Sequence, residues 1–159
     1  GIANTTASSA MLAVLTGQTV TSVVGAGTGI NPQQQAHKVA VIECAIAARN
    51  ADSQAPLEVL AKLGGLEIAA MAGAYLAAAA QGLPAIVDGF IATVAALTAC
   101  RMCPAVHGYL IFGHRSQEPG HDVALKALEA KPLLDMGMRL GASGDSDGGG
   151  NGYLCRCRC

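Results

Sequence analysis

Three short apolar runs alternate with helix-like segments in the second half of the chain, and this alternation restricts the fold more than any other feature of the sequence. The runs are 85–87, 109–112 and 132–136, and the helix-like segments between them are 90–102 and 119–129. Strands that alternate with helices in this way are typical of parallel βαβ units. We therefore expect an α/β fold with a parallel sheet flanked by Ala-rich helices.

The first half of the chain reads as helices separated by glycine-containing breaks. We expect one helix that follows a polar opening and stops at Gly17, and three more over 32–50, 57–63 and 66–80. Asn31 and Pro32 are residue types preferred at the N-cap and the first position of a helix. The apolar run Ile68–Ala80 is shorter than the ~20 residues that a membrane-spanning helix needs. It predicts a buried helix, and no membrane partner.

The composition indicates one folded domain followed by a short tail. Hydrophobic residues make up 52% of the 159 residues and charged residues 13%, which is typical of a chain that folds. A net charge of -1 and an aromatic content of 3% argue against nucleic-acid binding, which relies on basic surfaces and stacking platforms. From 141 onward the chain is rich in Gly, Asp, Ser and Asn and ends Cys-Arg-Cys-Arg-Cys. We expect 1–140 to form a single domain or a large piece of one, and 141–159 to be disordered.

The cysteines and histidines do not follow the spacing of a metal or redox site. Cys44, Cys100 and Cys103 lie in Ala-rich, helical surroundings, where we expect reduced and buried thiols. The Cys100-x-x-Cys103 pair has no second pair nearby, and His114 and His121 lack the spacing of zinc enzymes. We expect no metal or cofactor. A thiol or zinc module that also uses the C-terminal cysteines stays open as an alternative.

Polar residues follow the predicted strands, where open parallel sheets bind their ligands. Asp88 comes after the first strand, 114–116 after the second, and the segment beyond Leu140 after the third. Asn4-Thr5-Thr6 precedes the first helix, and free N–H groups at a helix start bind anions. These four places together suit a phosphate-bearing ligand.

Each of these signals also has a purely structural explanation. Asn4-Thr5-Thr6 is equally the pattern of an N-cap, and Asp88 would look the same if it only capped the next helix. Lys38 on a helix is usually a solvated charge. The glycine run 25–29 is not spaced as G-x-G-x-x-G and follows no convincing strand, so it does not indicate a dinucleotide site.

Six ordered motifs together resemble the nicotinate-nucleotide:dimethylbenzimidazole phosphoribosyltransferase family. They are GIANTT (1–6), GTGI (27–30), LGGLEIAAMAG (63–73), LPAIVDGFIAT (83–93), GHRSQEPGH (113–121) and PLLDMGMRLG (132–141). The resemblance covers residues 1 to about 141. Six motifs in the family's order are much more specific than any one of them alone.

The resemblance implies an enzyme of cobalamin lower-ligand assembly with a Rossmann-like α/β domain. Such an enzyme moves ribose 5-phosphate from nicotinate mononucleotide to 5,6-dimethylbenzimidazole and releases α-ribazole phosphate and nicotinate. Family members are homodimers and are more than twice as long, so we expect this chain to be a central fragment. No export signal is apparent in the sequence, and we expect a cytoplasmic location.

The resemblance also implies which residues meet the substrates. The phosphate is expected at the Gly1 backbone, Asn4, Thr5, Thr6 and Lys38, the ribose at Asp88, the ribose or phosphate at Ser116, and a close backbone approach at Gly64 and Gly65. The family's catalytic base is a glutamate in the pattern Leu-Gly-Glu-Gly-Ser-Gly, and here the matching residue is Ala142. We therefore expect no catalytic residue at that position and no turnover by this chain. The competing interpretation is an inert fragment that keeps only a phosphate- or nucleotide-binding site.

Overall fold

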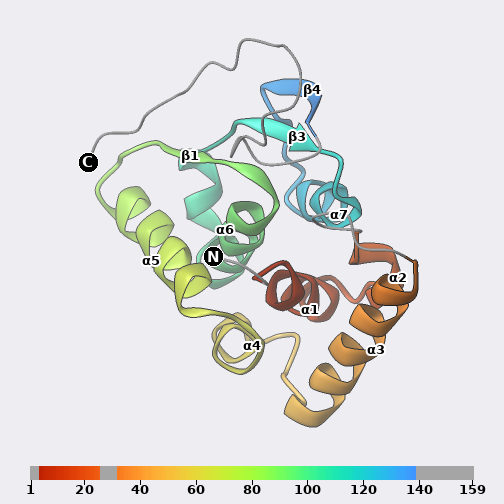
Figure 1. Ribbon diagram of the computed structural model, residues 1–159. Coiled ribbons are helices and arrows are strands. Elements are labelled where there is room, and N and C mark those ends of the chain that lie inside the picture. Colours follow the sequence, from red (N-terminus) through yellow and green to blue (C-terminus); the bar gives the residue numbers. More distant parts are fainter. Residues whose placement is uncertain (1–3, 26–31, 139–159) are drawn as a thin grey trace.

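The computed structural model describes residues 4–25 and 32–138 and shows an α/β fold (Figure 1). Its elements, in chain order, are α1 (Asn4–Thr16), α2 (Val20–Val23), α3 (Pro32–Arg49), α4 (Pro56–Leu63), α5 (Leu66–Ala80), β1 (Ala85–Val87), α6 (Gly89–Met102), the 3-10 helix η1 (Pro104–Tyr109), β2 (Leu110–Phe112), β3 (His114–Ser116), α7 (Pro119–Ala127) and β4 (Leu134–Met138). Gly1, Ala142 and the predicted disordered segment 141–159 lie outside the described residues.

The strands form two small parallel pairs that continue into each other. β1 pairs with β2 in register Ala85 to Leu110, and β3 pairs with β4. Only Gly113 separates β2 from β3, and it forms hydrogen bonds with β1 and β4. Its N–H donates to the Val87 carbonyl, and its own carbonyl accepts from the Leu134 N–H. The parallel sheet predicted from the alternating pattern is therefore confirmed.

Helix α6 lies at the centre of the core. Every residue from Ala92 to Ala99 is buried, because α6 contacts α1, α4, α5 and α7 around its circumference. Ala and Thr side chains at these positions let several helices approach α6 closely. Glycine does the same at Gly120, where an added Cβ would lie 2.6 Å from the Val23 carbonyl oxygen and 2.8 Å from the Phe90 ring. The ends of α2, α6 and α7 are thereby packed together.

The helices lie on one side of the strands (Figure 1). Within the described ranges the other side of β1 and β2 is open: Ile86 is 71% exposed and its register partner Ile111 is 39% exposed, whereas the adjacent Val87 and Phe112 are buried. Parallel sheets in complete domains are usually covered on both faces. The described residues thus form a partial α/β domain, as the sequence predicted.

The prediction that the run Ile68–Ala80 is a buried helix was wrong for part of its circumference. Ile68, Ala72 and Tyr75 are buried, but Gly73, Ala74 and Ala77 are exposed. None of the helices within the described ranges is long and apolar enough to cross a membrane. The expected burial of the cysteines was also wrong at two of three positions, because Cys44 and Cys103 are exposed and only Cys100 is partly covered. Burial raises the pKa of the Cys100 thiol to about 11.

Three local details differ from the expectations. The polar run 114–116, expected only as a polar cluster after the second strand, is itself strand β3, and the four-residue helix α2 was not predicted. Residues 4–6, expected to precede the first helix, are already helical and belong to α1. The other predicted helices and strands end within two or three residues of the observed ones.

Candidate functional site

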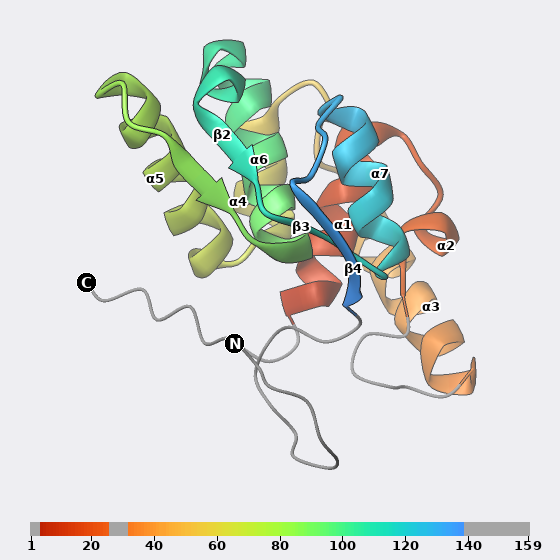
Figure 2. The same cartoon turned by 90° about the horizontal axis from the view of Figure 1, so that it is seen from above.

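The carboxyl ends of the strands and the starts of several helices lie at one edge of the molecule, which we call the carboxyl edge. Figure 2 shows β1, β3 and β4 ending there, beside the first turns of α1, α5 and α6. Helix starts carry unpaired N–H groups and a partial positive charge. An edge of this kind favours an anionic ligand.

Lys38 reaches this edge from α3. Its Nζ donates to Thr5 Oγ1 in the first turn of α1, at 3.0 Å. Partial burial lowers the pKa of the Lys38 ammonium, while the negative charge of Glu118 acts in the opposite direction. A partly desolvated ammonium at a helix start, in a first turn with no acidic residue, is an environment that a phosphate would stabilise.

Asn4 and Thr6 lie in the same first turn and are partly exposed. Their side chains form no hydrogen bond with any other described residue. They are therefore available at the start of α1, next to the bonded pair Lys38 and Thr5. Glu118 lies close to Gly25, where an added Cβ would overlap its carboxylate.

Asp88 does not act as the side-chain cap of α6. It occupies the N-cap position with extended backbone angles, yet its side chain makes no capping bond. Its carboxylate pairs with His114 Nδ1 at 2.9 Å, and the Asp88 side chain stays 81% exposed whereas that of His114 is 13% exposed. Gly89, at a φ of +78°, makes the turn from β1 into α6 at this point. The Asp88 carboxylate is thus an exposed hydrogen-bond acceptor at the carboxyl edge.

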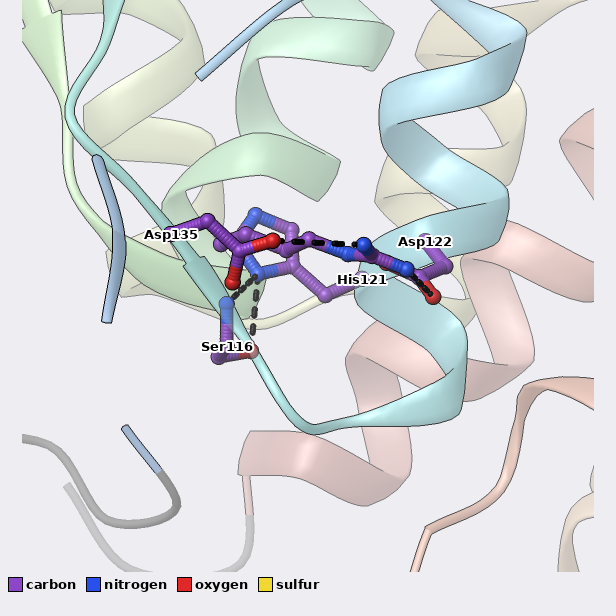
Figure 3. A network of polar contacts seen from close by, with 5 residues as sticks. Ser116, His121, Asp122 and Asp135 are labelled. Carbon is purple, nitrogen blue, oxygen red and sulfur yellow. Dashed lines mark hydrogen bonds and ion pairs between the residues drawn. The ribbon is translucent and has the colours of Figure 1, made fainter. Parts of the chain in front are cut away.

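Ser116 ends β3 and bonds to the buried His121 of α7 (Figure 3). His121 Nδ1 lies 3.1 Å from the Ser116 backbone nitrogen and 2.7 Å from Ser116 Oγ. The other ring nitrogen, Nε2, lies 3.0 Å from Thr93 Oγ1 on α6. Burial, reinforced by the neighbouring His114, lowers the pKa of His121 to about 4. This imidazole is therefore neutral at physiological pH.

Arg115 ties β3 to its neighbours and is not a free cation. It donates two hydrogen bonds to the Asp122 carboxylate, from Nε at 2.7 Å and from Nη2 at 2.6 Å, and a longer one to Asp135 (Figure 3). The bonds from Arg115 lower the pKa of Asp122. Because its charge is already matched, Arg115 is a poor phosphate ligand.

Gly64 and Gly65 have packing contacts of their own. An added Cβ at Gly64 would lie 2.8 Å from a Leu60 methyl group and 3.0 Å from Met11 Sδ. At Gly65 it would meet the Glu67 carboxylate at 2.6 Å. At Gly64 the Leu60 carbonyl oxygen would lie closer still, at 2.5 Å, so Gly64 is explained by its close approach to the last turn of α4 and to α1. The predicted approach of substrate to both glycines stays a prediction.

The structure thus pairs Lys38 with Thr5, while Asp88 and Ser116 each pair with a histidine. His121 and Thr93 were not selected from the sequence as site residues, because they come from different helices and share no local spacing. The one available signal was the position of His121 in the first turn after Pro119, opposite the polar strand 114–116. Among the described residues, no group of three or more His, Cys, Asp or Glu side chains is placed to hold a metal ion.

Comparison with known proteins identifies relatives over most of the chain. Residues 1–146 match the family model DBI_PRT, described as phosphoribosyltransferase. A protein of Azotobacter vinelandii named nicotinate-nucleotide--dimethylbenzimidazole phosphoribosyltransferase is 55% identical over 89% of this chain and 40% of its own length. The protein of the same name from Xanthomonas oryzae is 55% identical over 91% of the chain and 41% of its own length.

A solved structure agrees with these sequence matches. The crystal structure of CobT from Thermus thermophilus superposes with a TM-score of 0.83 at 44% identity, over 89% of this chain and 42% of that one. The chain therefore spans about 40% of the length of the curated relatives it matches.

Proposed function

The chain belongs to the DBI_PRT phosphoribosyltransferase family, and from this premise we propose that it carries part of an enzyme that uses nicotinate mononucleotide. In the proposed reaction, ribose 5-phosphate passes to 5,6-dimethylbenzimidazole, and the products are α-ribazole phosphate and nicotinate. The names of the curated relatives support both substrates. We further propose that the working enzyme is a cytoplasmic homodimer that binds neither nucleic acid nor membranes.

The observation that carries the proposal is the partly buried Lys38 ammonium bonded to Thr5 at the start of α1. A phosphate dianion placed there would meet Lys38 and the free N–H groups of the first turn. Gly1, Asn4 and Thr6 would complete its surroundings. Such charge-assisted bonds are about twice as strong as neutral ones. They would hold the ribose 5-phosphate during the transfer.

The ribose would then extend toward Asp88, and Ser116 would meet either the ribose or its phosphate. Ribose hydroxyl groups are donors, and the exposed Asp88 carboxylate is an acceptor at the end of β1. Ser116 is partly exposed and is the last residue of β3, a strand that ends at the same edge in Figure 2. We keep Gly64 and Gly65 as predicted points of close backbone approach.

The chemistry of the transfer needs a base and no general acid. In nicotinate mononucleotide the nicotinate ring is a cationic pyridinium bonded to the ribose. When this bond breaks the ring becomes neutral, so its departure requires no proton. The attacking benzimidazole must lose its N–H proton while its other ring nitrogen bonds to the anomeric carbon. The resemblance puts the base at a position where this chain has Ala142. We therefore propose that this chain binds nicotinate mononucleotide without turnover, which is also what the inert-fragment alternative describes.

A matched pair of rebuilt proteins tests this assignment. Both receive the portions that the longer relatives contain and this chain lacks, including a family-like C-terminal helix. One carries Leu-Gly-Glu-Gly-Ser-Gly from position 140, and the other keeps Ala142. We expect the first protein to form α-ribazole phosphate. The rate of the second should be lower by a factor of about 10² to 10⁴, which is the usual contribution of a general base. Equal rates from the two, or product from the chain as given at a comparable rate, would refute the role of position 142.

A further inference from the structure

Two polar groups of Ser116 lie within hydrogen-bonding distance of one ring nitrogen of His121. Nδ1 lies 3.1 Å from the Ser116 backbone N and 2.7 Å from Ser116 Oγ. His121 is 1% exposed, so water cannot replace either donor at little cost. Ser116 itself is partly exposed at the carboxyl edge.

The neighbouring bonds determine which nitrogen carries the proton. Thr93 Oγ1 donates to the Gly89 carbonyl at 2.7 Å, and its hydroxyl has a single proton. In its contact with His121 Nε2 at 3.0 Å, Thr93 must therefore accept. Nε2 consequently bears the hydrogen, and Nδ1 has the lone pair toward which both Ser116 groups point.

We propose that His121 is a positioning residue, which orients the Ser116 hydroxyl in the free protein so that this hydroxyl can donate a hydrogen bond to the phosphate of the ligand. In the free protein the hydroxyl donates to Nδ1. When a phosphate monoester binds, the hydroxyl turns to a phosphate oxygen, and the Ser116 N–H alone keeps Nδ1 bonded. No buried nitrogen loses its last partner during the exchange.

The surroundings of Ser116 favour phosphate as the group that receives this bond. Glu118, two residues further along the chain, interacts electrostatically with Lys38, so the Lys38 ammonium lies on the same side of the edge. Phosphate oxygens only accept hydrogen bonds, which suits a hydroxyl donor. The exposed Asp88 carboxylate only accepts, and it suits the ribose hydroxyls instead. This inference rests on the proposed function, since it assigns one contact within the same site.

The hydrogen bonds that run from Ser116 through His121 and Thr93 to Gly89 also connect the end of β3 with the start of α6, the two elements that border the proposed site. Ser116 ends β3, and Gly89 begins α6 directly after Asp88. A neutral imidazole bonded to both elements fixes their separation. His121 acts through Ser116 and the backbone, and it does not itself reach the ligand.

Nitrogen NMR of the histidine side chains tests the proposal directly in the unmodified chain. The ¹⁵N-labelled protein is titrated with ribose 5-phosphate, and ribose serves as the phosphate-free control. We expect Nδ1 of His121 to move toward the value of a weakly bonded pyridine-type nitrogen on addition of ribose 5-phosphate. The Nε2–H signal should stay, and ribose should have no effect. In Ser116→Ala the phosphate-dependent movement should vanish and the affinity should fall about tenfold or more.

Two further variants separate positioning from packing. His121→Asn keeps an acceptor near the position of Nδ1 and should retain most of the affinity for ribose 5-phosphate, whereas His121→Leu should lose about as much as Ser116→Ala. An unmoved His121 signal at saturating ribose 5-phosphate overturns this inference and leaves the proposed function standing. Failure of both ribose 5-phosphate and nicotinate mononucleotide to bind overturns both.

Discussion

Acid should destabilise the fold through His121. Burial in the folded state, with the charge of His114 in support, lowers its pKa from 6.5 to about 4; Arg115 acts in the same direction, and Asp122 and Asp88 act against it. The folded chain therefore binds fewer protons than the unfolded chain between these two values. The contribution of His121 to the free energy of unfolding is complete above about pH 6.5 and decreases as the pH falls toward 4. At about 1.4 kcal/mol per tenfold change in proton affinity, the total is about 3 kcal/mol.

Urea unfolding followed by circular dichroism at intervals from pH 8 to pH 4 measures this loss. His121→Asn removes the titrating group, so the free energy of unfolding of the wild-type chain should fall by about 3 kcal/mol more than that of the variant over this range. His37→Asn, at an exposed position without a hydrogen-bond partner among the described residues, is the matched control and should follow the wild type. A wild-type minus His121→Asn difference that stays constant with pH would refute the reasoning.

Substitutions of two glycines and one aspartate should have distinct effects. Gly120→Ala places a Cβ against the Val23 carbonyl and the Phe90 ring and should cost about 1 to 3 kcal/mol in thermal unfolding. Gly73→Ala, in an exposed helical position with open space around it, should instead stabilise the chain by about 0.5 to 1 kcal/mol; equal effects of the two would contradict the packing described. Asp88→Asn should change the free energy of unfolding by no more than about 0.5 kcal/mol, because the side chain is exposed. The same change should weaken the binding of nicotinate mononucleotide measured by calorimetry. An unchanged affinity would show that Asp88 is not part of the site.

The parallel strands and most of the helices could be predicted because their signals are local. Apolar runs of three or four residues before Asp88 and before the 113–116 cluster mark β1 and β2, and spacing of three to four marks α3. Strand β3 could not be recognised, because its residues are His114, Arg115 and Ser116. Each of these polar side chains bonds to another element, and such bonds leave no pattern in a single sequence.

The one-sided burial of α5 escaped prediction for a different reason. Its residues are almost all apolar and mostly Ala, so the sequence offers no polar face to mark the exposed side. Which side is covered depends on α6, which packs against it. The network of Ser116, His121 and Thr93 likewise depends on three elements meeting in space. Asp88 could be selected from sequence because it directly follows a strand, but its bond to His114 could not.

Calorimetric titration of the chain with nicotinate mononucleotide, beside its phosphate-free counterpart nicotinate riboside, tests the central claim most directly. The site at the start of α1 predicts binding of the mononucleotide and much weaker binding of the riboside. Lys38→Met should greatly reduce this preference, because it removes the ammonium that is bonded to Thr5. Equal affinities for the two ligands, or a preference that Lys38→Met leaves unchanged, would contradict the account.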